Sequence, residues 1–300
     1  MDFIRVADLG VAGLGEVVEL AAAVKQDPDP TRGRLGGKRV GLFFEKPSMR
    51  TRVSCELATV DLGAVPIVLK QDEVGLGKRE SVADVARVLD RYLDVLAFRV
   101  FHHGDLETLA AHATAPVINL LSDLEHPCQA IADLQTLAEA RPLEGAVIAY
   151  IGDGNNVCNS LMIAGAALGV TVAVASPPGY APAAEVVAAA RAIATAGAQI
   201  VVTEDPAAAA TGADAVYADV WTSMGQETEA ADRLKVFAPY RIDEKLFALA
   251  GDDAIFLHCL PAHRGEEVTD GVIDHVRSRV FDQAENRLHA FKALLLHLAG

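Results

Sequence analysis

The sequence predicts an α/β protein with two doubly wound parallel-sheet domains and an active site in the crevice between them. From Val40 onward, short apolar runs typical of buried strands alternate with segments typical of helices. This alternation is characteristic of parallel sheets joined by crossover helices. A helical segment from about 126 to 139, followed by the turn sequence ARPLEG, interrupts the alternation before it resumes. The chain therefore divides into two α/β halves.

Nine apolar runs are predicted as strands, four in the first half and five in the second. In order they are VGLFF, VPIVL, DVLAFRV and PVINL, then AVIAYIG, VTVAVAS, AQIVVT, DAVYADV and AIFLHC. We expect a first domain over 1–140 and a second over 141–283. The segment 284–300 is predicted as a helix that packs back on the first domain, because its apolar residues have helical spacing. These are Leu288, Phe291, Leu294, Leu295 and Leu298.

Composition excludes several classes of protein. A formal net charge of -15 argues against binding to nucleic acid, which depends on a basic face. No stretch is long and apolar enough for a membrane span, and the N-terminus lacks the pattern of a secretion signal. The cysteines lie far apart without CxxC spacing, so we expect neither a disulfide framework nor a metal site. They are Cys55, Cys128, Cys158 and Cys259. A cytoplasmic protein fits this composition.

The first predicted strand is followed by KPSMRTR, which indicates the start of a helix and an anion site. Ser48 is placed to cap that helix. The apolar residues at helical spacing behind it are Met49, Val53, Leu57 and Val60. A helix N-terminus attracts anions, and Arg50 and Arg52 are poorly placed in a first turn unless an anion offsets them. The alternative is that Ser48 is only a cap and that the arginines make surface ion pairs.

Polar residues follow two further strands of the first half. Arg99 ends the strand DVLAFRV, at the edge of the sheet where open parallel sheets bind ligands. His126 and Gln129 lie at the start of the helix that follows PVINL, where they could donate hydrogen bonds to a carbonyl or phosphoryl oxygen. Taken singly, an ordinary helix cap with a solvated histidine explains this second segment better.

The second half offers groups suited to a small amino acid. The turn GDGNN lacks the third glycine of a dinucleotide-binding loop, since Val157 stands there, but Asn155 and Asn156 could bind a carboxylate or merely cap a helix. Asp219 ends the strand DAVYADV and suits an ammonium group. Cys259 follows AIFLH, either at the crevice or as a buried, inert thiol.

Together these motifs resemble the transcarbamylases, and most closely the ornithine carbamoyltransferases. They are SMRTR, HPCQ, GDGNN, DVWTSMGQE, HCLPAHRGEEV and ENRLHAFKALL, in this order. The resemblance runs from about Leu35 to the C-terminus. It implies a carbamoyl-phosphate-binding domain, an ornithine-binding domain, no metal or organic cofactor, and a homotrimer or a multiple of it.

The resemblance also assigns site residues. Carbamoyl phosphate is expected to contact Ser48, Met49, Arg50, Thr51, Arg99, His126, Gln129, Cys259, Leu260 and Arg287. L-Ornithine is expected to contact Asn156, Asp219, Ser223 and Met224. The catalytic residues are expected to be Arg50, Thr51, Arg99, His126 and Cys259. The implied reaction transfers the carbamoyl group to the δ-amino group of ornithine and yields citrulline and phosphate.

Alternatives and departures accompany this hypothesis. The acceptor could instead be an N-acylated ornithine, putrescine or aspartate, or the chain could be a non-catalytic binding relative. Met49 stands where the family commonly has Thr, which keeps the backbone donor and loses a hydroxyl. Gly75, in a loop that resembles one reaching the neighbouring subunit, stands where many relatives have Gln. Lys78 or Arg79 could substitute for that contact electrostatically.

Overall fold

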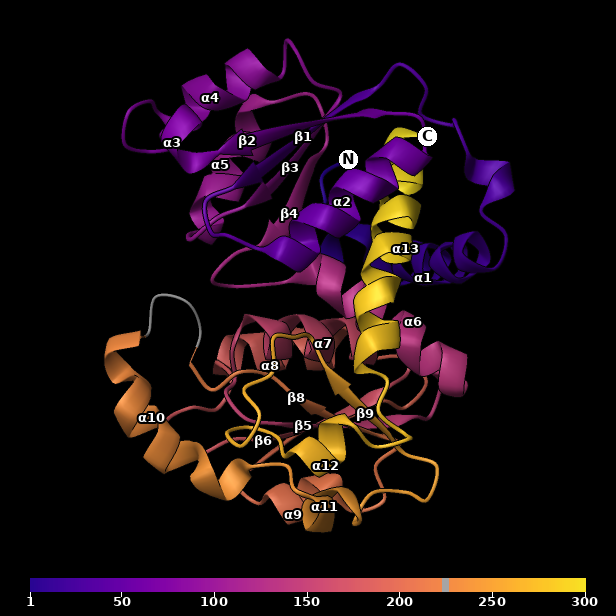
Figure 1. The fold of residues 1–300 in the computed structure, drawn as a ribbon, viewed down its shortest axis with the longest axis vertical. Coiled ribbons are helices and arrows are strands. Elements are labelled where there is room, and N and C mark those ends of the chain that lie inside the picture. The colour runs from indigo at the N-terminus through magenta and orange to yellow at the C-terminus, as the bar shows by residue number, and fades with distance from the viewer. Residues whose placement is uncertain (223–226) are drawn as a thin grey trace. The chain divides into compact units, whose positions relative to one another are not determined.

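The computed structural model describes residues 1–222 and 227–300 and divides into two compact units. Unit 1 comprises Met1–Gln135 with Glu285–Gly300, and unit 2 comprises Thr136–Ala284. Each unit contains one parallel sheet with helices between its strands (Figure 1), so the α/β fold with two parallel sheets is confirmed. The assignment of one substrate to each domain stays a prediction at this point.

The sheet of unit 1 has four parallel strands in the order β2-β1-β3-β4. They are β1 (Arg39–Phe44), β2 (Val65–Lys70), β3 (Val95–Arg99) and β4 (Val117–Leu121). The helices of this part of the chain are α1 (Gly10–Gln26), α2 (Met49–Asp61), α3 (Gln71–Val74), α4 (Val82–Leu89), α5 (His103–His112), α6 (Pro127–Ala140) and α13 (Val280–Ala299). Short 3-10 turns cover Val6–Leu9 and Asp29–Thr31. Each predicted strand of this half is present.

The C-terminal part of α13 is fixed to the N-terminal part of unit 1 by buried polar contacts. Lys25 Nζ donates to Asn286 Oδ1 at 2.8 Å, and Gln135 Nε2 donates to the same oxygen at 3.2 Å. Lys292, which is almost fully buried, forms an ion pair with Asp61 at the end of α2. These contacts bring Arg287 to the beginning of α2.

The sheet of unit 2 has five parallel strands in the order β7-β6-β5-β8-β9. They are β5 (Val147–Ile151), β6 (Thr171–Ala175), β7 (Ile200–Thr203), β8 (Ala215–Ala218) and β9 (Ile255–His258). The helices are α7 (Asn156–Ala167), α8 (Ala184–Ile193), α9 (Pro206–Ala210), α10 (Ala230–Phe237), α11 (Glu244–Phe247) and α12 (Asp270–Ile273). Short 3-10 turns cover Glu227–Glu229 and Ala238–Tyr240. The chain order reverses between β5 and β8, which is the position where doubly wound sheets bind ligands.

The apolar stripe of α2 does not face the core of unit 1. The helix is present as predicted, but its large apolar residues are about half exposed or more. The exposed fractions are 71% for Met49, 50% for Val53, 49% for Leu57 and 56% for Val60. The face turned inward carries smaller residues, namely Thr51, Cys55, Ala58 and Thr59. An exposed apolar stripe of this kind marks a contact surface more often than a simple solvent face.

Candidate active site

Four predicted site segments of unit 1 meet around the carboxyl ends of its strands. Arg50 and Thr51 begin α2 after β1, Arg99 is the last residue of β3, and His126 lies between β4 and α6. Parallel strands place all their carboxyl ends at one edge of the sheet, where the following helices begin. Arg287 of α13 completes this group. The fold therefore explains why residues so far apart in the sequence are neighbours.

The start of α2 is built as predicted for a capped helix. Ser48 is extended, with φ -157°, and its hydroxyl accepts a hydrogen bond from the Thr51 N–H. The same hydroxyl donates to Thr51 Oγ1 at 2.8 Å, and Arg287 Nη2 donates to Thr51 Oγ1 from the other side. Arg52 pairs with Glu56 on the exposed face, so the surface-pair alternative holds for this arginine.

Two buried guanidinium groups flank a buried histidine in unit 1. Arg99, His126 and Arg287 are 7%, 4% and 8% exposed. Burial, then the charge of Arg287 and then that of Arg99, hold the pKa of the His126 imidazole well below its usual range. His126 is therefore neutral at physiological pH and can donate one hydrogen bond. Within the described residues Arg287 makes no ion pair with a carboxylate, and a buried unpaired cation favours an anionic ligand.

Gln129 adds an acceptor to this set of donors. It is 1% exposed in the first turn of α6, and its Nε2 donates to Asp133 Oδ1 at 2.7 Å. A carboxylate only accepts hydrogen bonds, so this contact fixes which end of the Gln129 amide faces Asp133. Gln129 Oε1 is buried and has no hydrogen-bond partner among the described residues. It suits the NH2 group of a ligand.

A second layer of buried polar groups supports the segment before His126, and the sequence reasoning missed it. Glu125 Oε2 accepts from the Val6 N–H at 2.8 Å, and the Glu125 carbonyl accepts from the Ser122 N–H at 2.9 Å. Ser122 Oγ in turn lies 2.8 Å from His103 Nδ1. Asn119 Nδ2 donates to the Ile4 carbonyl at 2.9 Å. The contacts reach more than one hundred residues along the chain, which no local motif reveals.

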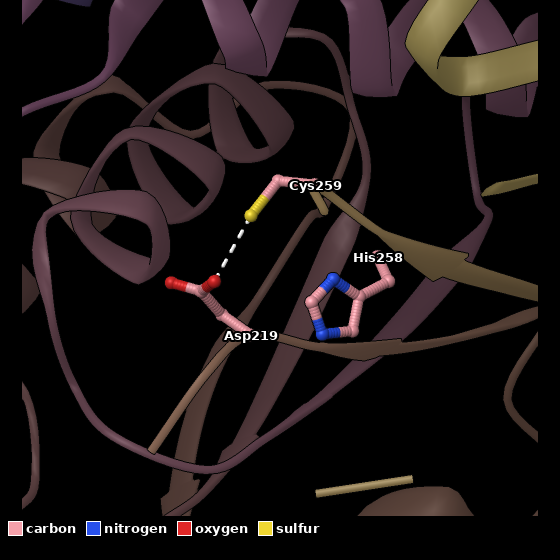
Figure 2. A group of neighbouring side chains, drawn as sticks. All are labelled: Asp219, His258 and Cys259. Carbon is pink, nitrogen blue, oxygen red and sulfur yellow. Dashed lines mark hydrogen bonds between the residues drawn. The ribbon is translucent and has the colours of Figure 1, made fainter. Parts of the chain in front are cut away.

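Asp219 is the centre of the candidate site in unit 2. It follows β8 and is 6% exposed. Its Oδ1 accepts from the Val220 N–H at 2.8 Å and from the thiol of Cys259 at 3.0 Å. Its Oδ2 accepts from Asn155 Nδ2 at 2.7 Å. Figure 2 shows the Cys259 thiol directed at this carboxylate. Cys259 is half-buried and takes part in the strand-end cluster, so it is not the fully buried thiol of the second alternative, and its position at the crevice stays a prediction.

The two asparagines of the GDGNN turn occupy different positions at the start of α7. Asn155 caps α7, because its Oδ1 accepts from the N–H groups of Val157 and Cys158 at 2.9 and 3.2 Å. Asn156 is the first residue of α7. Gly154 is required here, since a Cβ atom would lie 2.2 Å from the Pro182 nitrogen. The capping alternative is therefore correct for Asn155, while carboxylate binding by Asn156 stays a prediction.

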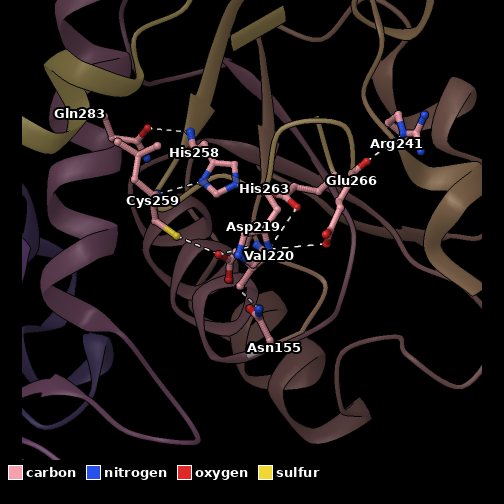
Figure 3. Close-up of polar contacts among 11 residues, drawn as sticks. Asn155, Asp219, Val220, Arg241, His258, Cys259, His263, Glu266 and Gln283 are labelled. Carbon is pink, nitrogen blue, oxygen red and sulfur yellow. Dashed lines mark hydrogen bonds and ion pairs between the residues drawn. The ribbon is translucent and has the colours of Figure 1, made fainter. Parts of the chain in front are cut away.

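The segment after β9 is held by the buried side chain of His258. Its Nδ1 accepts from the Leu260 N–H at 2.8 Å, and its Nε2 lies 3.1 Å from Glu267 Oε1. The His258 N–H donates to Gln283 Oε1 at 2.8 Å. Figure 3 shows these contacts leading from Gln283 through His258 and Cys259 to Asp219 and Asn155. Sequence reasoning selected Cys259 and Leu260 and missed the buried residues that hold them, which are His258, Glu267 and Gln283.

The loop after β8 is anchored at its start by a buried ion pair that sequence reasoning also missed. Arg233 of α10 pairs with Asp153, and its Nε donates to the Trp221 carbonyl at 2.5 Å. Burial raises the pKa of the Asp153 carboxyl, and Arg233 opposes that shift. The predicted ornithine contacts Ser223 and Met224 lie outside the described residues.

Two groups in the described part of unit 2 have donor atoms close enough to hold a metal ion. They are Asp219, His258 and Cys259, and His263, Glu266 and Glu267. Both ring nitrogens of His258 are already engaged, by the Leu260 N–H and by Glu267. The first group therefore offers no free imidazole lone pair, and its geometry favours a hydrogen-bonded cluster.

Met49 and Gly75, the two residues that depart from the family pattern, lie in different structural environments. The Met49 side chain points to solvent, with 71% of it exposed. Gly75 ends α3 with φ 63°, the left-handed conformation that favours glycine. A Cβ atom at Gly75 would lie 2.6 Å from Arg79 Cβ. A glutamine at this position would therefore strain the present backbone.

Comparison with known proteins agrees with the motifs. Residues 1–139 match the family model described as "Aspartate/ornithine carbamoyltransferase, carbamoyl-P binding domain", and residues 144–298 match its "Asp/Orn binding domain". No helix in the described ranges is long and apolar enough to cross a membrane.

The relatives and solved structures cover nearly the whole chain. An ornithine carbamoyltransferase of Synechocystis is 49% identical over 300 residues, covering 100% of this chain and 96% of the relative. One of Anoxybacillus flavithermus is 51% identical, with 99% and 96% covered. The solved structure of the Pyrococcus furiosus enzyme has a TM-score of 0.95 at 46% identity, with 99% and 96% covered. That of the anabolic enzyme from Campylobacter jejuni has a TM-score of 0.94 at 38% identity, with 99% and 98% covered.

Proposed function

This chain belongs to the aspartate/ornithine carbamoyltransferase family, and we propose that it converts carbamoyl phosphate and L-ornithine to L-citrulline and phosphate. It is a carbamoyltransferase, and arginine biosynthesis fits the anabolic Campylobacter jejuni relative. The observation that carries the proposal is the buried set of donors at the start of α2, where Arg287 meets Thr51 without a carboxylate partner. A dianionic phosphoryl compound supplies the missing negative charge.

Carbamoyl phosphate is assigned to unit 1. Its phosphate accepts hydrogen bonds from Ser48, whose hydroxyl would turn from Thr51 to the ligand, from the backbone N–H of Met49, and from Arg50 and Arg287. Its carbonyl oxygen accepts from Thr51, Arg99 and the neutral His126. Its NH2 group donates to the buried Oε1 of Gln129, which otherwise lacks a partner. Every polar group of the substrate then has a partner of the opposite kind.

Ornithine is assigned to unit 2. Asp219 pairs with the α-ammonium group, and Asn156 donates to the α-carboxylate. Ser223 and Met224 are proposed to contact the amino acid as well. An N-acylated ornithine could not form the ion pair with Asp219, and putrescine lacks the carboxylate that Asn156 would bind. Free ornithine therefore fits these residues better than either alternative.

In the proposed reaction, the neutral δ-amino group attacks the carbonyl carbon of carbamoyl phosphate. A C–N bond forms, the carbonyl π electrons move to the oxygen, and a tetrahedral intermediate results. The electrons return as the C–O bond to phosphate breaks, and the amine loses one proton, which the departing phosphate takes up to leave as hydrogen phosphate. Thr51, Arg99 and His126 stabilise the charge on the carbonyl oxygen, and preorganised donors of this kind are each worth roughly 2.7 to 4 kcal/mol. Cys259 and Leu260 are proposed to lie against the reacting groups.

The proposal is tested by measuring citrulline formation from carbamoyl phosphate and L-ornithine. Parallel reactions contain N-acetylornithine, putrescine or aspartate as the acceptor. We expect turnover with ornithine alone. Preferred turnover of another acceptor would refute the substrate assignment, and no product with any acceptor would favour a non-catalytic binding protein.

We further propose that the protein is a homotrimer, or a multiple of one, in the cytoplasm. The exposed apolar stripe of α2 supports self-association, and α2 contacts β2, an edge strand whose Val65 and Ile67 are also exposed. A second copy of the chain would cover this surface. In the described residues, no disulfide joins Cys55, Cys128, Cys158 or Cys259, which supports a reducing compartment.

A further inference from the structure

We propose that His258 is a positioning residue for carbamoyl transfer, which holds Cys259 and Leu260 in the conformation that the substrates require. The inference rests on the proposed function, because it concerns the segment after β9 that is assigned to the site. His258 is the last residue of β9 and is fully buried. It therefore acts through its neighbours and does not itself touch a substrate.

The hydrogen bonds of His258 select one neutral tautomer. The Leu260 N–H donates to Nδ1 at 2.8 Å, so Nδ1 carries the lone pair and Nε2 carries the proton. Nε2 lies 3.1 Å from Glu267 Oε1, which can only accept. The same oxygen accepts from the His263 N–H at 2.6 Å. Since His258 and Glu267 are both 0% exposed, no water competes for these contacts.

These hydrogen bonds hold the backbone of Leu260 in a conformation that it would otherwise leave. Leu260 has φ 58°, a left-handed conformation that is unfavourable for a residue with a side chain. Its N–H is bound by the His258 ring, and the His258 N–H is bound by Gln283. Cys259 lies between these two fixed points and reaches Asp219 at 3.0 Å. Loss of the Leu260 contact therefore moves the thiol and the Leu260 carbonyl together.

Two matched variants of His258 separate the two ring nitrogens. In His258→Asn, the amide oxygen can take the place of Nδ1 and accept from the Leu260 N–H. In His258→Gln, the amide nitrogen can take the place of Nε2 and donate to Glu267, but the Leu260 N–H loses its acceptor. We expect His258→Gln to lower kcat about ten- to hundredfold, with a smaller change in KM for carbamoyl phosphate. His258→Asn should stay within about fivefold of the unchanged protein.

Glu267 provides a second pair that does not alter the histidine. Glu267→Gln keeps a carbonyl oxygen that can accept from His258, whereas Glu267→Met leaves the imidazole without an acceptor and no longer selects its tautomer. We expect Glu267→Met to resemble His258→Gln, and Glu267→Gln to resemble the unchanged protein. If His258→Gln does not fold, the Glu267 pair tests the same positioning role through the other ring nitrogen of His258.

The rate of Cys259 alkylation by iodoacetamide, followed by peptide mass spectrometry, provides a readout that does not depend on activity. We expect His258→Gln and Glu267→Met to raise this rate about tenfold. The thiols of Cys55 and Cys158 serve as references, since both are buried and are expected to react slowly in every variant. Equal kcat and equal Cys259 alkylation within each pair would overturn the inference. An unchanged protein that makes no citrulline would instead contradict the proposed function, while the alkylation result would still decide the role of His258.

Discussion

Replacing Arg287 by Met should lower carbamoyl transfer by about two to three orders of magnitude and leave the stability of the protein nearly unchanged. Arg287 is 8% exposed, donates to Thr51 and makes no ion pair with a carboxylate among the described residues. Without substrate, this buried charge is uncompensated. In the proposed complex with carbamoyl phosphate, the same charge would be a direct partner of the ligand.

The size of both effects follows from these contacts. Loss of one preorganised donor costs roughly 2.7 to 4 kcal/mol of transition-state stabilisation. For the folded protein, removal of a buried charge is favourable, and Thr51 loses one hydrogen bond from a charged donor, worth about 1.5 to 3 kcal/mol, while it keeps the contact with Ser48. The two terms oppose each other. We expect the free energy of unfolding to change by less than about 1 kcal/mol, which corresponds to about 4 °C or less in Tm.

The assay combines citrulline kinetics with thermal unfolding in the presence and absence of carbamoyl phosphate. A ligand at one hundred times its Kd stabilises the folded state by about 2.7 kcal/mol, and Arg287→Met should lose most of this gain. Arg32→Met is the control, because Arg32 is exposed and, among the residues that the structure describes, forms an ion pair with Asp29 alone. Retention of kcat/KM within about threefold would refute the reasoning. A loss of activity that merely follows a large fall in Tm would refute it too.

Four further outcomes are expected. Arg99→Met should lower kcat about a hundredfold or more, as measured by citrulline formation, and a change below about tenfold would contradict its placement at the carbonyl oxygen. The pKa of His126 is lowered in the folded protein, so the unfolded chain binds a proton at this residue more readily. The stability contributed by the neutral imidazole is therefore present above about pH 6.5 and is lost as pH falls below that value. Urea unfolding at pH 5 to 8 measures this, and His126→Asn should flatten the profile. Because only the unprotonated amine is nucleophilic, kcat/KM for ornithine should rise through mildly alkaline pH, and a flat profile would count against amine attack unless a slow non-chemical step hides the rise. Leu57→Asp should convert the proposed trimer to smaller species by sedimentation, whereas Glu56→Gln, on the same helix, should not.

Strand and helix order could be predicted from the sequence because each apolar run is a local signal. The runs that became β1 and β9 are bounded by turn residues and carry their site groups at their ends, so KPSMRTR and HCLP could be read directly. Ser48 and Asn155 cap their helices, which is also a local property.

Long-range polar contacts could not be predicted in this way. Nothing near Glu125 in the sequence indicates that it accepts from Val6, and nothing near Arg233 indicates that Asp153 is its partner. The helical spacing of Val53 and Val60 predicted α2 correctly but did not say which side of the helix faces the core. The spacing of apolar residues predicts that they share one side of a helix. Which other elements cover that side depends on the packing of the folded chain.

The helix α2 combines an N-terminus that is proposed to bind phosphate with an apolar outer stripe on the same few turns. If copies of the chain cover that stripe, weaker contact between the copies would displace α2. Because Ser48 and Thr51 lie at the start of this helix, they would move with it. Specific activity would then depend on protein concentration and fall on dilution below the dissociation constant of the assembly. Bound carbamoyl phosphate would lower the protein concentration at which the assembly dissociates. The cell's supply of carbamoyl phosphate would then help to keep the enzyme that uses it assembled.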